Sequence, residues 1–295
     1  MDTIKIRQMR STDIEAVMQF KNAENWNQTE QDWQFLMDNN PENCLVACDE
    51  DVVVGSVTAM NYNNKLAWIG MLLVSKAYRG FGLGKMLLNA ILEKLEACES
   101  IKLDAVPDMV ATYQKWGFVE EYKVCRMTTA KLKHINETRQ RMDRDLSDEP
   151  MVKLLPITEQ TIAEISEVDS HLYGVNRLNL LQFLLNQKNG VCSQIKQDDR
   201  VLGYVLGREG SQYSQVGPVL AQSVGNVQML LSSVFQKLTG KSVVVDVLMN
   251  QKEIIDWLYS LGFVDQRRFT RMYLKGTTDQ GKLTKQYLTS GPELG

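Results

Sequence analysis

Hydrophobic and polar positions change period repeatedly along the first 130 residues, and they predict strands alternating with helices. Strand patterns lie at residues 4–9, 44–48, 52–60, 101–106 and 118–128. Residues 67–74 form a continuous apolar run, which is typical of a strand buried on both faces. The long strand at 118–128 is expected to close this first unit.

Helical patterns fill the intervals between these strands. Apolar residues recur at helical spacing over residues 84–97, which predicts a long amphipathic helix. Shorter helices are expected at residues 29–37 and 110–116, the second ended by Gly117. Ser11, followed closely by acidic residues, indicates the N-cap of a further helix. The first half, residues 1–130, therefore has the alternating order of a mixed α/β (α+β) sheet.

The chain changes character after residue 130. Residues 131–150 are rich in charge and poor in large apolar side chains, so we interpret them as a linker that is partly helical. A second domain is expected over residues 151–276. A tail, residues 277–295, follows it.

The second half repeats segments of the first half in the same order. The matching segments are Val53-Val54-Gly55 and Val201-Leu202-Gly203, Ile69-Gly70 and Val216-Gly217, Lys102-Leu103-Asp104 and Val244-Val245-Asp246, and Gly117-Phe118 and Gly262-Phe263, the last continuing to Arg126-Met127 and Arg271-Met272. Convergent strand composition is the alternative explanation, but matches that keep their order favour two copies of one fold.

A glycine-rich turn separates the buried strand from the long helix. It contains Arg79, Gly80, Gly82, Gly84 and Lys85. Alternate glycines let the backbone turn tightly and direct several N–H groups to one side, at the positive end of a helix. Such a turn binds a pyrophosphate, and the two cationic side chains can add contacts. A purely structural strand–helix connection is the alternative.

The spacing of this turn excludes two common phosphate loops. A Walker A loop needs Ser or Thr after Gly-Lys, but Met86 follows Lys85. A dinucleotide fingerprint needs wider spacing between its later glycines and an acidic residue after the next strand. The run from Arg79 to Gly84, Arg-x-x-Gly-x-Gly, instead resembles the signature of the GNAT acetyltransferase superfamily.

A second segment strengthens this resemblance. Tyr113-Gln114-Lys115-Trp116-Gly117-Phe118 is similar to the Tyr-x-x-x-Gly-Phe segment that GNAT domains carry after the next strand. In that family the tyrosine protonates the departing coenzyme A thiolate, which assigns the role to Tyr113; a core tyrosine is the alternative. The resemblance implies that the pantetheine arm pairs with the strand at Leu72, Leu73 and Val74.

The resemblance therefore implies acetyl-coenzyme A as cosubstrate and one binding site per chain. Its expected cofactor-binding residues are Leu72, Leu73, Val74, Arg79, Gly80, Phe81, Gly82, Leu83, Gly84 and Lys85. The second half has no equivalent turn, and Leu258 stands at the position that matches Tyr113. The second half is thus expected to be a degenerate GNAT-like domain that shapes the acceptor site or only supports the first.

The acceptor site is less clearly marked. The whole chain resembles a tandem subgroup of GNAT proteins, through the segment from Asn25 to Asp32 and the tail end from Ser290 to Gly295. Trp26 either borders the acceptor cleft, or this segment serves core packing or helix capping around Asn27 and Thr29. We further hypothesise that the tail packs back onto this cleft.

Several carboxylates are candidates for taking the proton of the acceptor amine. They are Asp104, Glu24 and Asp32, although Asp104 and its repeat partner Asp246 can instead share a structural role. The predicted activity is direct transfer of an acetyl group to a primary amine of a small molecule or amino acid. A coenzyme A-binding sensor without turnover is the alternative.

Composition narrows the remaining classes. A hydrophobic content of 44 % and a charged content of 23 % are typical of soluble globular domains. The net charge of −3 gives no global field for nucleic acid or an anionic membrane. The cysteines are scattered, which predicts free thiols, and the few histidines predict no metal site. The absence of a signal-peptide pattern, together with free thiols, predicts a cytoplasmic location. A monomer or a homodimer is expected.

Overall fold

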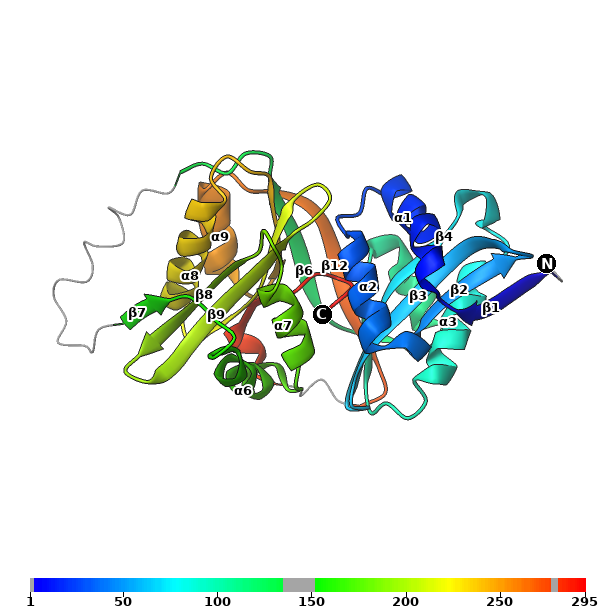
Figure 1. Cartoon of the computed structure of the whole chain (residues 1–295), viewed down its shortest axis with the longest axis horizontal. Helices are drawn as coiled ribbons and strands as arrows, with labels where there is room; N and C mark the ends of the chain where they lie inside the picture. Colours follow the sequence, from blue (N-terminus) through cyan, green and yellow to red (C-terminus); the bar gives the residue numbers. More distant parts are fainter. Residues whose placement is uncertain (1–2, 135–151, 277–280) are drawn as a thin grey trace.

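The computed structural model describes residues 3–134, 152–276 and 281–295, and a continuous mixed sheet runs through both halves of the chain (Figure 1). Its strand order is β1-β2-β3-β4-β5-β12-β6-β11-β13-β10-β9-β8-β7. The expected linker, 131–150, falls mostly outside the described residues. The expectation that it is partly helical lies there too.

The first half follows the predicted order of elements. Its elements are β1 (Ile4–Gln8), α1 (Ile14–Ala23), α2 (Glu30–Asn39), β2 (Cys44–Asp49), β3 (Val52–Tyr62), β4 (Leu66–Val74), α3 (Leu83–Lys94), β5 (Ile101–Ala105), α4 (Val110–Gln114) and β6 (Val119–Thr129). One predicted cap is different. Ser11 is not the cap at the start of α1. Instead, the Asp13 carboxylate accepts a hydrogen bond from the backbone N–H of Arg10 at 2.7 Å.

The second half repeats this order. Its elements are β7 (Val152–Leu155), α6 (Ile162–Tyr173), α7 (Leu178–Leu185), β8 (Val191–Gln197), β9 (Arg200–Glu209), β10 (Ser214–Ala221), α8 (Val224–Lys237), β11 (Val243–Leu248), α9 (Lys252–Ser260) and β12 (Val264–Leu274). The short strand β13 (Gln286–Leu288) then follows. Within the described residues, each α-helix and strand of one half, apart from β13, thus has a counterpart in the other.

The two halves exchange their last strands. β6 of the first half pairs with β11 of the second, and β12 of the second half pairs with β5 of the first. β6 and β12 also pair with each other. The expectation that residues 118–128 close the first unit is therefore wrong, because β12 takes that place. The exchange joins the halves through backbone hydrogen bonds.

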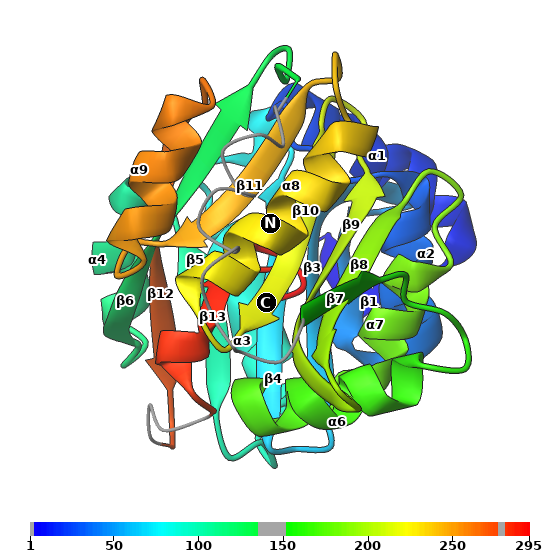
Figure 2. The same ribbon diagram turned by 90° about the vertical axis from the view of Figure 1, so that its left-hand side faces the viewer.

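Helices cover both faces of the sheet. On one face α1 and α2 of the first half and α6 and α7 of the second contribute to a single apolar core that spans both halves. On the other face α8 and α9 cover the second half with their own core, and α3 and α4 cover the first half (Figure 2). The continuous core on the first face fixes the relative position of the halves.

Candidate active site

The strands β4 and β5 separate at one end and leave an opening in the sheet. They are parallel and pair only where Ala67 meets Ile101 and Trp68 meets Lys102. Beyond that point the edge of β4 that faces β5 has no strand partner among the described residues. Unpaired N–H and C=O groups on such an edge can accept an added extended chain.

An irregularity in β4 lies beside this opening. The register with β3 shifts between Ser56 and Thr58, and Met71 adopts a left-handed backbone with φ of 52°. The Ser56 hydroxyl donates to the Met71 carbonyl at 2.9 Å, which holds the distorted backbone in place. A β-bulge of this kind redirects the peptide groups that follow it, here those of Leu72 and Leu73.

The glycine turn follows β4 directly. Gly80 and Gly82 have φ of 84° and 83°, a conformation that L side chains rarely adopt. The helix α3 then begins at Leu83. Arg79 donates from Nε to the Val74 carbonyl at 3.1 Å and from Nη2 to the Glu24 carboxylate at 2.6 Å. The turn therefore has the backbone form that the predicted anion site requires.

A cavity of about 590 Å³ joins the opening, the turn and the interface between the halves. The predicted residues that line it are Trp26, Leu72, Leu73, Val74, Arg79, Gly80, Gly82, Leu83, Gly84, Asp104 and Tyr113. Phe81, which is 63 % exposed, and Lys85 point to solvent and do not line it. Asp32, which is fully buried, does not line it either.

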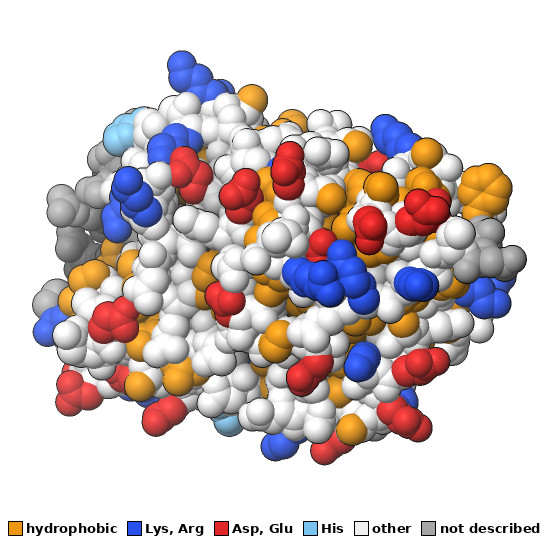
Figure 3. Space-filling view, turned by 45° about the vertical axis from the view of Figure 1, so that its right-hand side comes forward, with side chains coloured by type: hydrophobic (Ala, Val, Ile, Leu, Met, Phe, Trp, Pro, Cys, Tyr) orange, Lys and Arg blue, Asp and Glu red, His pale blue; other side chains and the backbone are white. Residues whose placement is uncertain are grey.

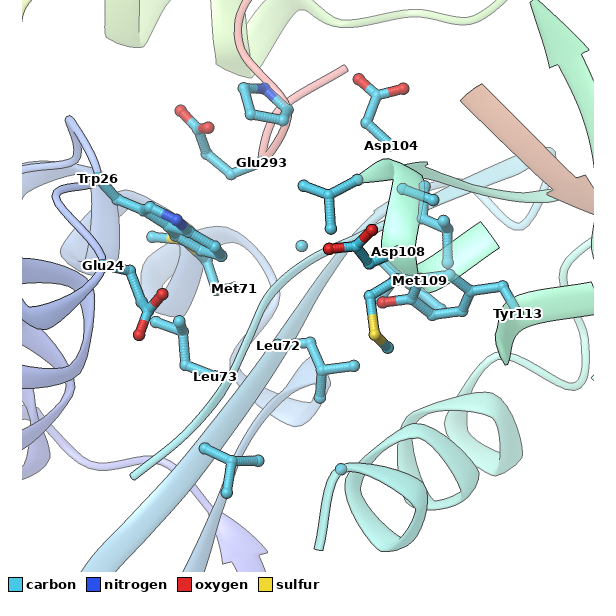
Figure 4. Close-up of a pocket in the computed structure, with 18 of the residues that line it drawn as sticks. Glu24, Trp26, Met71, Leu72, Leu73, Asp104, Asp108, Met109, Tyr113 and Glu293 are labelled. Carbon is cyan, nitrogen blue, oxygen red and sulfur yellow. The ribbon is translucent and has the colours of Figure 1, made fainter. Parts of the chain in front are cut away.

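Tyr113 stands on one wall of the cavity, on α4. Figure 4 shows Tyr113, Met109 and Asp108 on one side, and Trp26 and Glu24 on the other. The Tyr113 ring packs edge-on against Phe118, with ring centres 5.8 Å apart. Burial raises the pKa of Tyr113 to about 12. The phenol is therefore protonated at neutral pH, as a proton donor must be.

The loop that carries Trp26 is held by the second half. The Asn27 side chain accepts from the backbone N–H groups of Gln212 and Tyr213 at 3.0 and 2.9 Å, and donates to the Tyr213 carbonyl at 3.1 Å. Asp32 does not face the cavity, but caps α2 by accepting from the Thr29 N–H at 2.7 Å. Cavity lining by Trp26 and capping by Thr29 are thus both present.

The tail brings a further carboxylate to the cavity. Glu293 and Pro292 line it, and the Trp68 indole donates to the Pro292 carbonyl at 2.9 Å. Gln28 donates to the Glu293 carboxylate at 2.7 Å, and Arg208 pairs with both Glu293 and Asp32. Burial is the largest influence on Glu293 and raises its pKa above the ordinary value. The tail therefore packs back onto the cleft, as hypothesised.

Asp104 is engaged by the second half. Its carboxylate accepts from Arg271 Nε and Nη2, both at 3.0 Å, and its side chain is only 1 % exposed. Its repeat partner Asp246 accepts in the same way from Arg126 of the first half, at 2.8 Å. The shared role of the two aspartates is thus an ion pair across the exchanged strands, which leaves Asp104 poorly placed to take a proton.

Sequence reasoning missed several residues that line the cavity, namely Gln28, Asp108, Arg126, Arg267, Phe269 and Glu293. Arg126, Arg267 and Phe269 come from the exchanged strands, so their place depends on a pairing that local patterns do not specify. Arg267 carried one usable signal. In the repeat it stands where the first half has Tyr122, and such a departure from a repeated strand can mark a binding position.

The second half fills its own equivalent of the cofactor opening. β10 and β11 pair over three residues from Ser214 and Val243, and then β13 enters between them and pairs with both. Gly217, the counterpart of Gly70, lies so close that an added Cβ would stand 1.9 Å from the Thr289 carbonyl oxygen. The chain's own segment thus occupies the position at which β4 of the first half stays open.

Residues 3–134, 152–276 and 281–295 contain no cluster of His, Cys, Asp and Glu that could hold a metal ion. No helix in those ranges is long and apolar enough to span a membrane.

Each half of the chain matches a known protein family. Residues 8–118 match the family described as "Acetyltransferase (GNAT) family". Residues 165–288 match the family described as "Acetyltransferase (GNAT) domain". The expected mixed sheet of two GNAT-like halves is therefore confirmed.

Curated relatives and solved structures extend over most of the chain. "Holothin acyltransferase" of Pseudoalteromonas sp. (strain SANK 73390) is 24 % identical over 85 % of this chain and 81 % of that protein. An uncharacterised N-acetyltransferase of Bacillus subtilis (strain 168) is 23 % identical over 68 % of this chain and 66 % of that protein. A crystal structure from Pyrococcus horikoshii has a TM-score of 0.79 at 22 % identity, over 100 % of this chain and 97 % of that one. Together with the family matches to both halves, they lead to one assignment: this chain belongs to the GNAT acetyltransferase superfamily, with two GNAT domains in tandem, and is an acyltransferase enzyme.

Proposed function

We propose that this protein transfers an acetyl group from acetyl-coenzyme A directly to the primary amine of a small molecule or an amino acid. The observation that carries the proposal is the continuity of the cavity, which joins the glycine turn, the open edge of β4, Tyr113 and Trp26. A donor bound at the turn and along β4 would leave the Trp26 side free for the acceptor.

The residues at the turn fit this cosubstrate. The positive φ of Gly80 and Gly82 forms a concave backbone at the N-terminus of α3, which suits a pyrophosphate. An added Cβ at Gly84 would be only 3.9 Å from the Val74 side chain, so the helix start and the strand end lie close together. The open edge of β4 suits the amide groups of a pantetheine arm.

Bound acetyl-coenzyme A would supply an activated acyl group and a thiolate leaving group. The chain's residues then act on protons and position. Amides after the Met71 bulge can donate to the acyl carbonyl oxygen. Tyr113 holds a proton for the leaving sulfur, since its raised pKa keeps it protonated.

All five cysteines are unpaired, which supports a location in the reducing cytoplasm.

Replacement of Tyr113 by Phe tests the proposal. We expect Tyr113→Phe to bind acetyl-coenzyme A with an unchanged Kd in calorimetry. Thiol release with a panel of amines should fall by about 10²- to 10⁴-fold, because the proton donor is lost. Tyr259→Phe, a half-exposed tyrosine of the second half next to Leu258, is the matched control and should keep full turnover. Unchanged turnover in Tyr113→Phe would contradict the proposal, and tight cofactor binding without any turnover in the unaltered protein would indicate a sensor.

A further inference from the structure

The charged side chains that line the cavity fall into two groups. Most are held in ion pairs, namely Glu24 with Arg79, Asp104 with Arg271, Arg126 with Asp246, and Glu293 with Arg208. Asp108 and Arg267 also line the cavity, but neither has a hydrogen-bond or ion-pair partner among the residues that the structure describes. Both are exposed. The cavity thus presents one unpaired carboxylate and one unpaired guanidinium.

These two side chains come from neighbouring segments of different halves. Thr270 of β12 pairs with Ala105 of β5 in antiparallel register. Asp108 follows β5 in the short 3-10 helix Pro107–Met109, which contacts β12, the strand that carries Arg267. Figure 4 shows the Asp108 carboxylate directed into the cavity beside Tyr113. The strand exchange therefore brings a cation of the second half and an anion of the first to the same cavity, which the expected proton donor also lines.

Unpaired charges in a binding cavity restrict what can enter it. A ligand that covers an ionised group must replace its water, and this is costly unless the ligand supplies the opposite charge. A ligand that covers both Asp108 and Arg267 therefore has to carry one cationic and one anionic group. A guanidinium also offers two parallel N–H groups that match a carboxylate.

We propose that the acceptor is a small zwitterionic amine, an amino acid, whose ammonium group binds Asp108 and whose carboxylate binds Arg267. This inference rests on the proposed transferase function and specifies its substrate class. The cavity also offers two aromatic side chains to the rest of such an acceptor. Trp26 lines the side opposite Asp108, and Phe269 lies two residues beyond Arg267 on β12.

The proton and bond changes balance in this arrangement. The ammonium group gives one proton to Asp108 and becomes a neutral amine. Its nitrogen then bonds to the acyl carbon as the bond from that carbon to sulfur breaks, and Tyr113 protonates the sulfur. The second proton of the nitrogen returns through water to Tyr113, and Asp108 releases its proton to solvent. Each turnover forms one amide and one thiol and releases one proton.

The experiment compares free amino acids with their C-terminal amides as acceptors. We expect the unaltered protein to show a kcat/KM at least about tenfold higher for an amino acid than for its amide, since a charge-assisted contact is lost. Arg267→Gln should lower kcat/KM by about 10- to 100-fold for amino acids and leave the amides unchanged. Arg268→Gln is the matched control, because Arg268 is exposed, pairs with Asp265 and does not line the cavity.

Equal effects of Arg267→Gln on acids and amides, or a preference for amides, would overturn this inference while leaving the transferase proposal intact. Binding of the same acceptors, measured by ligand-detected NMR, separates the two proposals. Without turnover in the unaltered protein the transferase proposal fails. Selective binding of amino acids that Arg267→Gln abolishes would still uphold the zwitterion site, and unselective binding would overturn it.

Discussion

Asp104 on β5 accepts two hydrogen bonds of 3.0 Å from Arg271 on β12, so that a strand of the second half is bound by charge to the sheet of the first. The Arg271 guanidinium also lies 4.3 Å from the centre of the Trp68 ring. Because Arg126 and Asp246 form the reciprocal pair, the exchange is held on both sides of the β6–β12 contact. The two halves therefore form one structural unit around the cavity.

Breaking this pair should destabilise the protein. Asp104→Asn leaves the Arg271 guanidinium buried without a counter-charge, which costs about 3–5 kcal/mol of unfolding free energy. The measurement is denaturant unfolding. Asp265→Asn is the control, since its pair with Arg268 is exposed and its loss should change stability little. Equal effects of the two replacements would contradict the structural role of Asp104.

The tail should be sensitive to replacement of Gly70. An added Cβ there would lie 2.9 Å from the Glu293 Cα, a backbone atom that cannot move aside cheaply. We expect Gly70→Ala to lower the unfolding free energy by about 1–3 kcal/mol, the usual effect of overpacking.

Deletion of residues 290–295 should lower both Tm and turnover. Unchanged Tm and activity after the deletion would show that the tail has no role at the cavity.

Glu24 should compete with the cosubstrate for Arg79. The Glu24 side chain is 30 % exposed and the Arg79 side chain 47 %, so their ion pair is weak, and phosphate oxygens can replace the Glu24 carboxylate. We expect Glu24→Gln to strengthen acetyl-coenzyme A binding by roughly two- to fivefold, because Arg79 no longer has a competing carboxylate. Calorimetry of both proteins provides the comparison, with Glu159→Gln, an exposed position outside the cavity, as control. Weaker binding in Glu24→Gln would mean that Glu24 positions Arg79 for the donor.

The pH dependence of turnover should reflect the raised pKa of Tyr113. A proton donor acts only while protonated, so its contribution is lost as the pH rises through its pKa, about 12. We therefore expect no loss of kcat from Tyr113 between pH 7 and pH 10. A fall in kcat with an apparent pKa near 9 that Tyr113→Phe removes would show that the phenol ionises more readily.

Local patterns predicted most elements and the repeat, because the period of apolar residues depends on which face of each element is buried. The exchange of β6 and β12 escaped this reasoning. Both strands follow a Gly-Phe pair and carry Arg-Met at the same spacing, so either strand satisfies the pattern of either half. The pairing is decided by contacts between distant residues, such as Asp104 with Arg271.

The candidate site was predicted to a similar extent. The turn and Tyr113 lie within short motifs, and the structure places both at the cavity. The sequence pattern makes Asp32 a candidate proton acceptor, yet in the structure it caps α2 and pairs with Arg208 beneath the surface. Arg267, the proposed partner of the acceptor carboxylate, and Glu293, which lines the cavity, come from segments far along the chain, so their positions depend on the tertiary fold. Acidic and basic side chains are interspersed on the face in Figure 3, and the absence of nucleic-acid partners stays a prediction.

We propose one acetyl-coenzyme A site per chain, formed by the first half. β13 fills the equivalent opening of the second half, which also lacks the glycine turn. The most direct test is the stoichiometry of acetyl-coenzyme A binding, measured by calorimetry and native mass spectrometry of the full chain. We predict one molecule per chain, with binding abolished by Gly82→Val, because valine disfavours the left-handed backbone of the turn. Two molecules per chain, or binding that survives Gly82→Val, would contradict the account.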